Sequence, residues 1–178
     1  MKEVALRADV AVGTLYRYFP SKDHVLLAIA LDRYEVALQK LEKSPARGAT
    51  PGARVADYLL RQFRAEQREP LVTAATARVI HDTDRKYTFM LERISGAQQR
   101  ILRHVARGDG PEIGAARERT LVLVASCFGS ATRGWLSGVS SSADARFQIK
   151  LACCLLDLPE AQLDATLAEA VSLGGDGA

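Results

Sequence analysis

The sequence predicts an all-α protein in which an N-terminal helix-turn-helix head is joined to an antiparallel helical body. Apolar side chains recur every three or four residues along segments such as 25–41 and 55–63, which indicates helices with one buried face. Proline and glycine fall between such segments, as in residues 108–111, and mark the turns. Only residues 121–124 resemble a buried strand, and they lie within a longer helical pattern. We therefore expect no β-sheet.

The head begins with two short helices separated by a tight turn. Residues 4–8 predict the first helix, and Asp9 falls where the chain must turn. Pro20 ends the second helix, and Ser21 is suited to cap the next one. Three apolar side chains of the second helix recur at helical spacing and are expected to face inward: Val12, Leu15 and Phe19.

The outward face of the second helix suits DNA, since it carries a hydroxyl group, two phenols, a guanidinium and no carboxylate. Thr and Arg reach base edges, Tyr bonds phosphate oxygens, and Gly lets the backbone approach the duplex. The alternative is a helix face that is simply exposed to water. On such a face the two tyrosines and the glycine would lower helix propensity without making any compensating contact. The expected DNA-binding residues, including two lysines from the flanking helices, are Lys2, Val12, Gly13, Thr14, Tyr16, Arg17, Tyr18 and Lys22.

Length and composition narrow the function classes. The chain has 178 residues, 48% of them hydrophobic, which is enough for a core in one or two small domains. Its net charge of +3 is only mildly basic, so charge alone does not argue for nucleic acid. The three cysteines lack the spacing of metal ligands, and no apolar run approaches the roughly 20 residues of a membrane span. We expect a soluble cytoplasmic protein without metal or cofactor.

A composition shift at residues 44–51 marks the expected domain boundary. It predicts a DNA-binding region with its connecting helix at residues 1–47 and an effector-binding and dimerisation domain at 48–178. Thr50 is expected to cap the first body helix, with Pro51 at the first helical position. Beyond the head, the expected helices span 21–43, 51–68, 70–80, from Asp82 or Asp84 to 107, 112–138, 143–158 and 159–174.

The head resembles the DNA-binding signature of the TetR family of repressors, in the run Ala5-x-x-Ala8-x-Val10-x-x-Gly13-Thr14-Leu15-Tyr16-x-Tyr18-Phe19-x-x-Lys22. Asp9 stands where the family usually has glycine. We expect the turn to persist, because Asp tolerates a left-handed conformation. Family members carry a further helix before this motif, so the head is expected to be incomplete, through truncation or a start assigned too late.

The body resembles one branch of this family, the KstR-type repressors of steroid catabolism. The similarity lies in Ala49-Thr50-Pro51, in Pro70-Leu71-Val72-Thr73 and in Arg133-x-Trp135-Leu136. The inducers of that branch are acyl-CoA thioesters of sterol side-chain intermediates. The resemblance therefore implies a small hydrophobic effector, such as an acyl-CoA or a sterol-derived metabolite.

A pocket between body helices would be lined by aromatic and small polar side chains. For each aromatic, plain core packing is the favoured alternative, because most buried aromatics only pack. Met90 and the pair Ser126 and Ser130 are favoured, since hydroxyls on an otherwise apolar helix need a partner. The expected pocket residues are Tyr58, Phe63, Phe89, Met90, Ser126, Phe128, Ser130 and Trp135.

The segment 143–158 is apolar on two sides and needs two packing partners. One stripe holds Phe147, Leu151, Leu155 and Leu158; the other is expected to form a dimer interface and holds Ile149, Ala152 and Leu156. A central core helix is the alternative. The family resemblance favours the dimer, because members pair through their last two long helices into a four-helix bundle.

These features imply a homodimeric transcriptional repressor that binds a near-palindromic operator and is released by its effector. Two recognition helices would enter successive major grooves about 34–36 Å apart. The alternative is a small-molecule-binding helical module that no longer binds DNA because its head is truncated. We expect no enzyme: His81-Asp82-x-Asp84 resembles a metal-phosphohydrolase fragment but fits a helix cap, and no phosphate loop or nucleophile elbow occurs.

Overall fold

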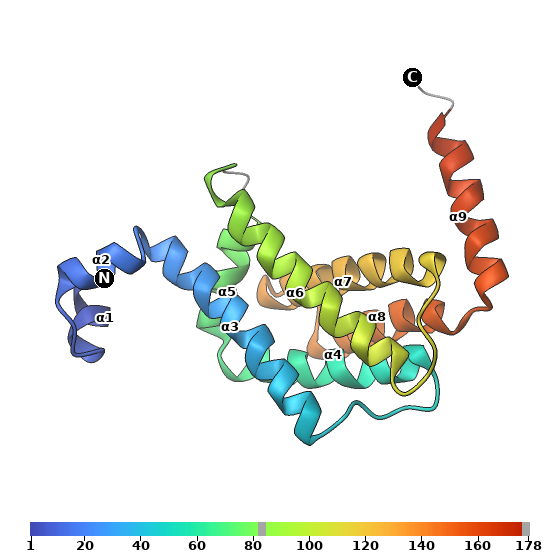
Figure 1. Cartoon of the computed structure of the whole chain (residues 1–178), viewed down its shortest axis with the longest axis horizontal. Helices are drawn as coiled ribbons and strands as arrows, with labels where there is room; N and C mark the ends of the chain where they lie inside the picture. The colour runs from blue at the N-terminus through green and yellow to red at the C-terminus, as the bar shows by residue number, and fades with distance from the viewer. Residues whose placement is uncertain (82–84, 176–178) are drawn as a thin grey trace.

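The structure, a computed structural model, describes residues 1–81 and 85–175, and their regular secondary structure is helical throughout. The expected all-α class is therefore confirmed (Figure 1). The elements are α1 (Lys2–Arg7), α2 (Val12–Tyr18), α3 (Lys22–Lys43), α4 (Pro51–Arg68), α5 (Pro70–Ile80), η1 (Arg85–Tyr87), α6 (Thr88–Arg107), α7 (Ala115–Leu136), α8 (Ser142–Cys154), η2 (Leu155–Asp157) and α9 (Glu160–Gly175).

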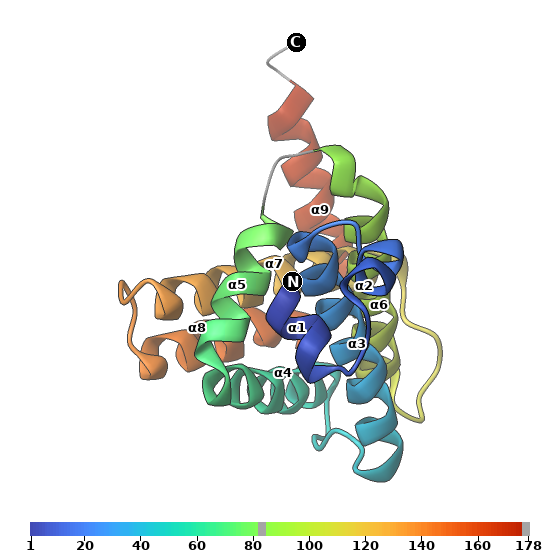
Figure 2. The ribbon, with the colours of Figure 1, turned by 90° about the vertical axis from the view of Figure 1, so that its left-hand side faces the viewer.

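The molecule is elongated, with a small head at one end and a helical bundle behind it. The helices α1 and α2 form the head, and α3 runs from the head into the body (Figure 1). Viewed from the head end, α1 and α2 lie in front of the bundle of α3 to α8 (Figure 2). The helix α9 projects from the opposite end of the body.

Helix ends follow the local sequence rules where a capping residue is present. The Ser21 hydroxyl accepts a hydrogen bond from the His24 backbone N–H at 3.3 Å, and Thr50 caps α4 in the same way through Ala53 at 3.1 Å. Both expected caps are confirmed. Gly108 ends α6 with a φ of +54°. The expected caps Asp82 and Asp84 lie outside the described residues, and α6 itself begins only at Thr88.

The end of α8 differs from the expected helix at 143–158, because α8 stops at Cys154 and tightens into η2. The Asp157 carboxylate accepts hydrogen bonds from the Gly52 backbone N–H at 2.7 Å and from the Thr50 hydroxyl at 2.9 Å. A Cβ atom on Gly52 would collide with the Cys153 carbonyl oxygen, so only glycine permits this close approach. A contact between distant segments therefore joins η2 to the start of α4.

Two apolar clusters hold the body together. The larger one joins α4, α6, α7 and α8 and contains, among others, Val55, Leu59, Phe63, Leu102, Leu121, Val124 and Ile149. The smaller one joins α3, α5, η1 and α6 and consists of Leu26, Leu27, Ala30, Val79, Tyr87 and Ile94. The helix that leaves the head is thus anchored on α5 and α6 rather than standing free. Across the described ranges, none of the helices is long and apolar enough to span a bilayer.

Candidate nucleic-acid interface and ligand cavity

The turn between α1 and α2 adopts the conformation expected at Asp9. The residue has a φ of +52°, in the left-handed region, and the Val10 backbone N–H donates a hydrogen bond to the Ala5 carbonyl oxygen at 3.0 Å. Ala5 is fully buried where the two helices meet. The expectation that the turn survives without glycine is confirmed.

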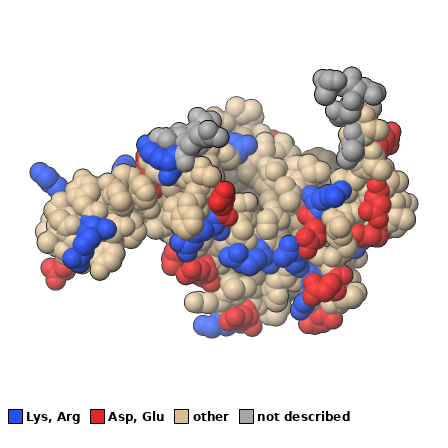
Figure 3. Space-filling view, turned by 45° about the horizontal axis from the view of Figure 1, so that its top comes forward, with Lys and Arg blue, Asp and Glu red and all other residues tan. Residues whose placement is uncertain are grey.

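The side chains expected to contact DNA lie on the surface of the head, apart from Thr14, which is partly buried. Tyr16 is 48% exposed and Tyr18 is 68% exposed, and the Arg17 guanidinium lies 5.3 Å from the centroid of the Tyr18 ring. On the face drawn in Figure 3, the head carries separate Lys and Arg side chains rather than a continuous basic patch. The geometry leaves these groups accessible to a duplex.

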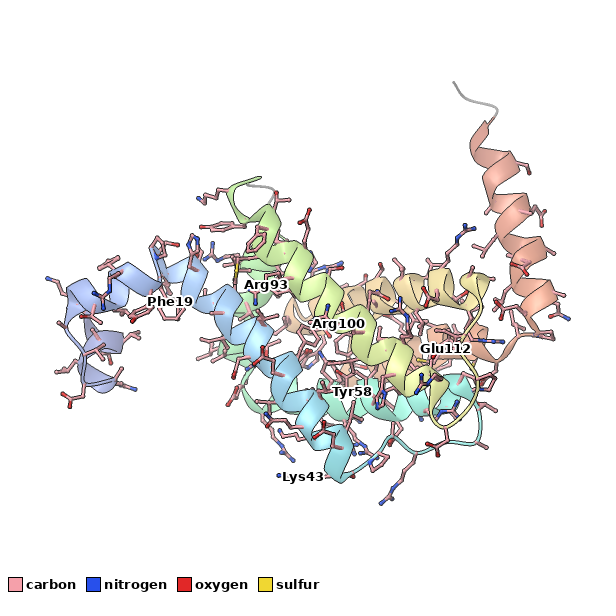
Figure 4. The ribbon with its side chains drawn as sticks, in the orientation of Figure 1. Phe19, Lys43, Tyr58, Arg93, Arg100 and Glu112 are labelled. Atoms are coloured by element: carbon pink, nitrogen blue, oxygen red, sulfur yellow. The ribbon has the colours of Figure 1, made fainter. Side chains whose placement is uncertain are left out.

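The apolar side of α2 is only partly as expected. Leu15 is buried, and Phe19 is partly buried at the junction of head and α3 (Figure 4). Val12 is 37% exposed, so the expectation that it faces inward is wrong. Because it occupies the first position of α2, little of the described chain packs over it. Its exposure agrees with its place among the expected DNA-binding residues.

Directly after the head, Asp23 ties the start of α3 to the body. Its carboxylate accepts hydrogen bonds from the Tyr87 hydroxyl at 2.9 Å and from the Arg78 guanidinium at 3.1 Å. The Tyr87 hydrogen bond, assisted by Arg78, holds the pKa of Asp23 below its usual value. Lys22 lies next to this cluster at the first position of α3. These hydrogen bonds connect α5 and η1 directly to the helix that carries the head.

A cavity of about 470 Å³ lies where α3, α4, α5, α6 and α7 meet. Its size falls within the range of about 300–1,000 Å³ that is common for small-molecule sites. The lining mixes apolar and polar side chains, and it comprises Arg33, Tyr34, Gln62, Glu66, Thr73, Thr76, Ala77, Ile80, His81, Leu91, Ile94, Ser95, Gln98, Gln99, Val122, Ala125, Ser126, Phe128, Gly129, Thr132 and Arg133.

Two of the expected pocket residues, Ser126 and Phe128, line this cavity. The Ser126 hydroxyl donates to the Val122 carbonyl oxygen at 3.0 Å, so its own helix already satisfies it. The expectation is wrong for the other residues, which lie elsewhere. Tyr58 and Phe63 are core residues, Trp135 packs edge-on against Phe63 and Met90 packs on the α3–α5 cluster, whereas Phe89 and Ser130 are exposed. Tyr58 lies among the body helices in Figure 4.

Sequence reasoning missed the polar centre of the cavity on α4. The Glu66 carboxylate accepts hydrogen bonds from the Gln62 amide and from the Thr132 hydroxyl, both at 3.2 Å. Burial raises the pKa of Glu66, although both hydrogen bonds and nearby Arg33 oppose that shift. One signal was available: Gln62 and Glu66, four residues apart, flank the inward-facing Phe63 on a strongly amphipathic helix.

At the rim of the cavity, α5 and α7 are joined by a contact between His81 and Arg133. The Arg133 guanidinium lies 2.5 Å from the His81 Nε2 atom. Burial, and next the Arg133 charge, lower the pKa of His81. A neutral imidazole accepts this hydrogen bond, so the contact favours the uncharged ring.

The apolar stripe expected to form the dimer interface lies inside the subunit. Ile149, Ala152 and Leu156 are at most 8% exposed and belong to the core that α8 shares with α4 and α7. That expectation is therefore wrong, because both stripes are apolar and spacing alone does not tell which one faces the subunit's own core. The exposed stripe is the other one: Phe147 is 65%, Leu151 58% and Leu155 42% exposed.

Within residues 1–81 and 85–175, no three His, Cys, Asp or Glu side chains gather as metal ligands would.

The sequence matches two family descriptions. Residues 1–29 match "Bacterial regulatory proteins, tetR family", and residues 48–156 match "Tetracyclin repressor-like, C-terminal domain". The second match spans more than half of the chain.

Curated relatives and a solved structure agree with these matches. The HTH-type transcriptional repressor KstR of Mycobacterium tuberculosis is 33% identical over 157 residues, which cover 88% of this chain and 70% of that protein. KstR of Rhodococcus jostii is 33% identical over 159 residues, covering 88% and 72%. The crystal structure of a TetR transcriptional regulator from Rhodococcus sp. RHA1 superposes with a TM-score of 0.78 at 29% identity, covering 89% of this chain and 84% of that one. The chain therefore belongs to the tetR family of bacterial regulatory proteins and is a KstR-like transcription regulator, not an enzyme.

Proposed function

We propose that the chain represses transcription by binding a near-palindromic operator as a homodimer and that a small effector releases it. The exposed polar and aromatic face of α2, within the matched tetR head, carries this proposal. The relatives that the chain resembles are named as transcriptional repressors. Residues 1–47 would then serve as the DNA-binding region and residues 48–178 as the effector-binding and dimerisation domain.

Roles on DNA follow from side-chain chemistry and exposure. Gly13 and Thr14 lie near bases, because a hydroxyl reaches a base edge and glycine permits close approach. Arg17 contacts a base or a phosphate. The other groups hold phosphates or approach the backbone, and these are Lys2, Val12, Tyr16, Tyr18 and Lys22.

A second copy of the chain covers the exposed apolar face of α7 and α8 in this proposal. On α8 the face is formed by Phe147, Leu151 and Leu155, and on the adjoining α7 Leu123 is 53% exposed. Apolar area of this kind on two packed helices favours a four-helix contact between two subunits. Two subunits would still meet through their late helices, as the sequence predicts. The exposed stripe of α8 would form that contact, rather than the buried stripe with Ile149, Ala152 and Leu156.

The cavity of about 470 Å³ is the proposed effector site, for an acyl-CoA or a sterol-derived metabolite. Both α5 and α6 line it and also pack against α3. A ligand that displaces α5 would shift α3 through the Asp23 contacts and change the separation of the two heads. Because coupling between two binding sites is reciprocal, operator DNA must weaken effector binding by the same factor by which the effector weakens operator binding.

Electrophoretic mobility shift with the DNA upstream of the chain's own gene tests the repressor. The 178-residue chain is compared with a version extended at its N-terminus. Binding by the 178-residue chain supports the proposal, whereas binding by neither version removes it. Binding by the extended version alone would assign the 178-residue chain to the alternative, a helical module that binds small molecules only.

A further inference from the structure

The α4 wall of the cavity presents hydrogen-bond acceptors that the described chain leaves partly unfilled. We propose that the effector carries an uncharged hydrogen-bond donor, an alcohol hydroxyl group, which binds the Glu66 carboxylate and the Gln62 Oε1 atom. This inference rests on the proposed function in one respect, namely that the cavity is the effector site. It makes the effector amphipathic rather than simply hydrophobic.

The Glu66 carboxylate has acceptor capacity to spare. Its Oε1 atom accepts one hydrogen bond, from the Gln62 Nε2 atom, and its Oε2 atom accepts one, from the Thr132 hydroxyl. An ionised carboxylate offers about four acceptor positions, so about two remain for a ligand. Because Glu66 lines the cavity, these positions are within reach of a bound molecule.

Gln62 adds a second acceptor beside the first. Its amide nitrogen is engaged with Glu66, while its Oε1 atom is buried with no hydrogen-bond partner among the described residues. Buried polar atoms without a partner are rare, because a buried atom whose hydrogen bond is not made keeps its full desolvation penalty. The unpartnered Tyr58 hydroxyl is also on α4 but does not line the cavity. The Gln62 Oε1 atom and the Glu66 carboxylate, which do line it, are acceptors, so a ligand group that fills them is a donor.

The charges around the cavity favour an uncharged donor over an ammonium group. Arg33 and Arg133 both line the cavity, and Glu66 is the sole acidic side chain among its described lining residues. A carboxylate on the ligand would place a second negative charge beside Glu66, which is unfavourable in a partly buried site. Ile80, Leu91 and Phe128 line the rest of the space and accommodate an apolar body.

Calorimetric titration of the full chain with two matched probes tests the inference. The probes are 1-decanol and 1-methoxydecane, which share their alkyl chain, while only the alcohol has a donor. We expect the alcohol to bind about tenfold more tightly, because a hydrogen bond to a charged group contributes about that much. Equal affinities, no binding of the alcohol, or tighter binding of decylammonium would each overturn the inference.

Substitution of Glu66 tests whether the preference for the alcohol over the ether arises from α4. In Glu66→Gln the new amide group can donate to the ether oxygen, so the preference for the alcohol should fall towards one. Glu92→Gln, on the exposed side of α6, is the matched control and should keep the tenfold preference. An unchanged preference for the alcohol in Glu66→Gln would show that Glu66 does not bind its hydroxyl group. If that variant unfolds, the two probes on the unsubstituted chain still test the inference.

Failure of the proposed function is distinguishable from failure of this inference. Operator binding is measured by mobility shift without any probe present. Absence of operator binding, with the alcohol still preferred, would overturn the repressor proposal and leave the donor site standing. Operator binding without a preference between the probes would overturn the donor site and leave the repressor proposal standing.

Discussion

The head and the body of this protein place their candidate functional groups in opposite ways. In the head, the groups come from one short stretch, lie on the surface and rest on little more than Ala5 and Leu15 as buried support. In the body, the cavity is lined from Arg33 to Arg133 by five helices. A change in the head should therefore alter DNA binding alone, whereas a change in the body should also alter the packing of several helices.

The largest effect is expected where the body core is broken. Leu156→Glu places a charge at a fully buried position and should lower the free energy of unfolding by about 3–5 kcal/mol. Thermal unfolding followed by circular dichroism measures this loss. A stable helical protein carrying Leu156→Glu would show that this side of α8 is not core, and would erase the contrast between the two stripes.

A charge on the exposed stripe of the same helix should separate subunits without unfolding them. Leu151 is 58% exposed, so Leu151→Glu should leave the unfolding midpoint of the monomer nearly unchanged. Analytical ultracentrifugation should show monomers, and operator affinity should fall roughly 10²–10⁴-fold, because linked heads bind with a high effective concentration.

Leu71→Glu on α5 is the control for that experiment. Leu71 is 85% exposed and belongs to α5 rather than to α7 or α8, so the same charge there should leave the dimer intact. Should Leu151→Glu sediment as a dimer, the subunit contact lies on another surface.

Within the head, two substitutions should divide base reading from phosphate holding. Lys22→Ala should weaken binding to operator and random DNA evenly and reduce the slope of log affinity against log salt by about one. Thr14→Ala should instead reduce the preference for the operator by about 1–3 kcal/mol. Fluorescence anisotropy over a salt series measures both, and an altered sequence preference in Lys22→Ala would reverse the assigned roles. Neither variant should change the unfolding midpoint.

The smallest effect concerns the junction of head and body. The pKa of Asp23 is lowered in the folded chain, by Tyr87 and then Arg78, so its stabilisation is present above the ordinary aspartate pKa. That stabilisation is lost as the pH falls through the lower, folded pKa. Asp23→Asn should therefore be less stable than the parent at neutral pH, and the difference should vanish in acid. A difference that persists unchanged at acid pH would exclude the carboxylate as its source.

Local rules alone determined the turn in the head and the starts of α3 and α4. The Asp9 turn, the Ser21 cap and the Thr50-Pro51 start each depend on residues a few positions apart, and the structure confirms all three. A hydrogen bond from a capping hydroxyl or a left-handed turn needs no distant partner. Their energies act on the local backbone, so the sequence carries the information directly.

Tertiary structure alone decided which side of α8 is buried, what η2 contacts and which groups line the cavity. Helical spacing marks both stripes of α8 as apolar, and only the positions of α4 and α7 select Leu156 as the inner one. Asp157 in η2 accepts a hydrogen bond from the Gly52 backbone N–H, because the fold brings the start of α4 to this point. Glu66 and Thr132 meet across 66 positions of chain, and periodicity within one helix contains no information about such a pair.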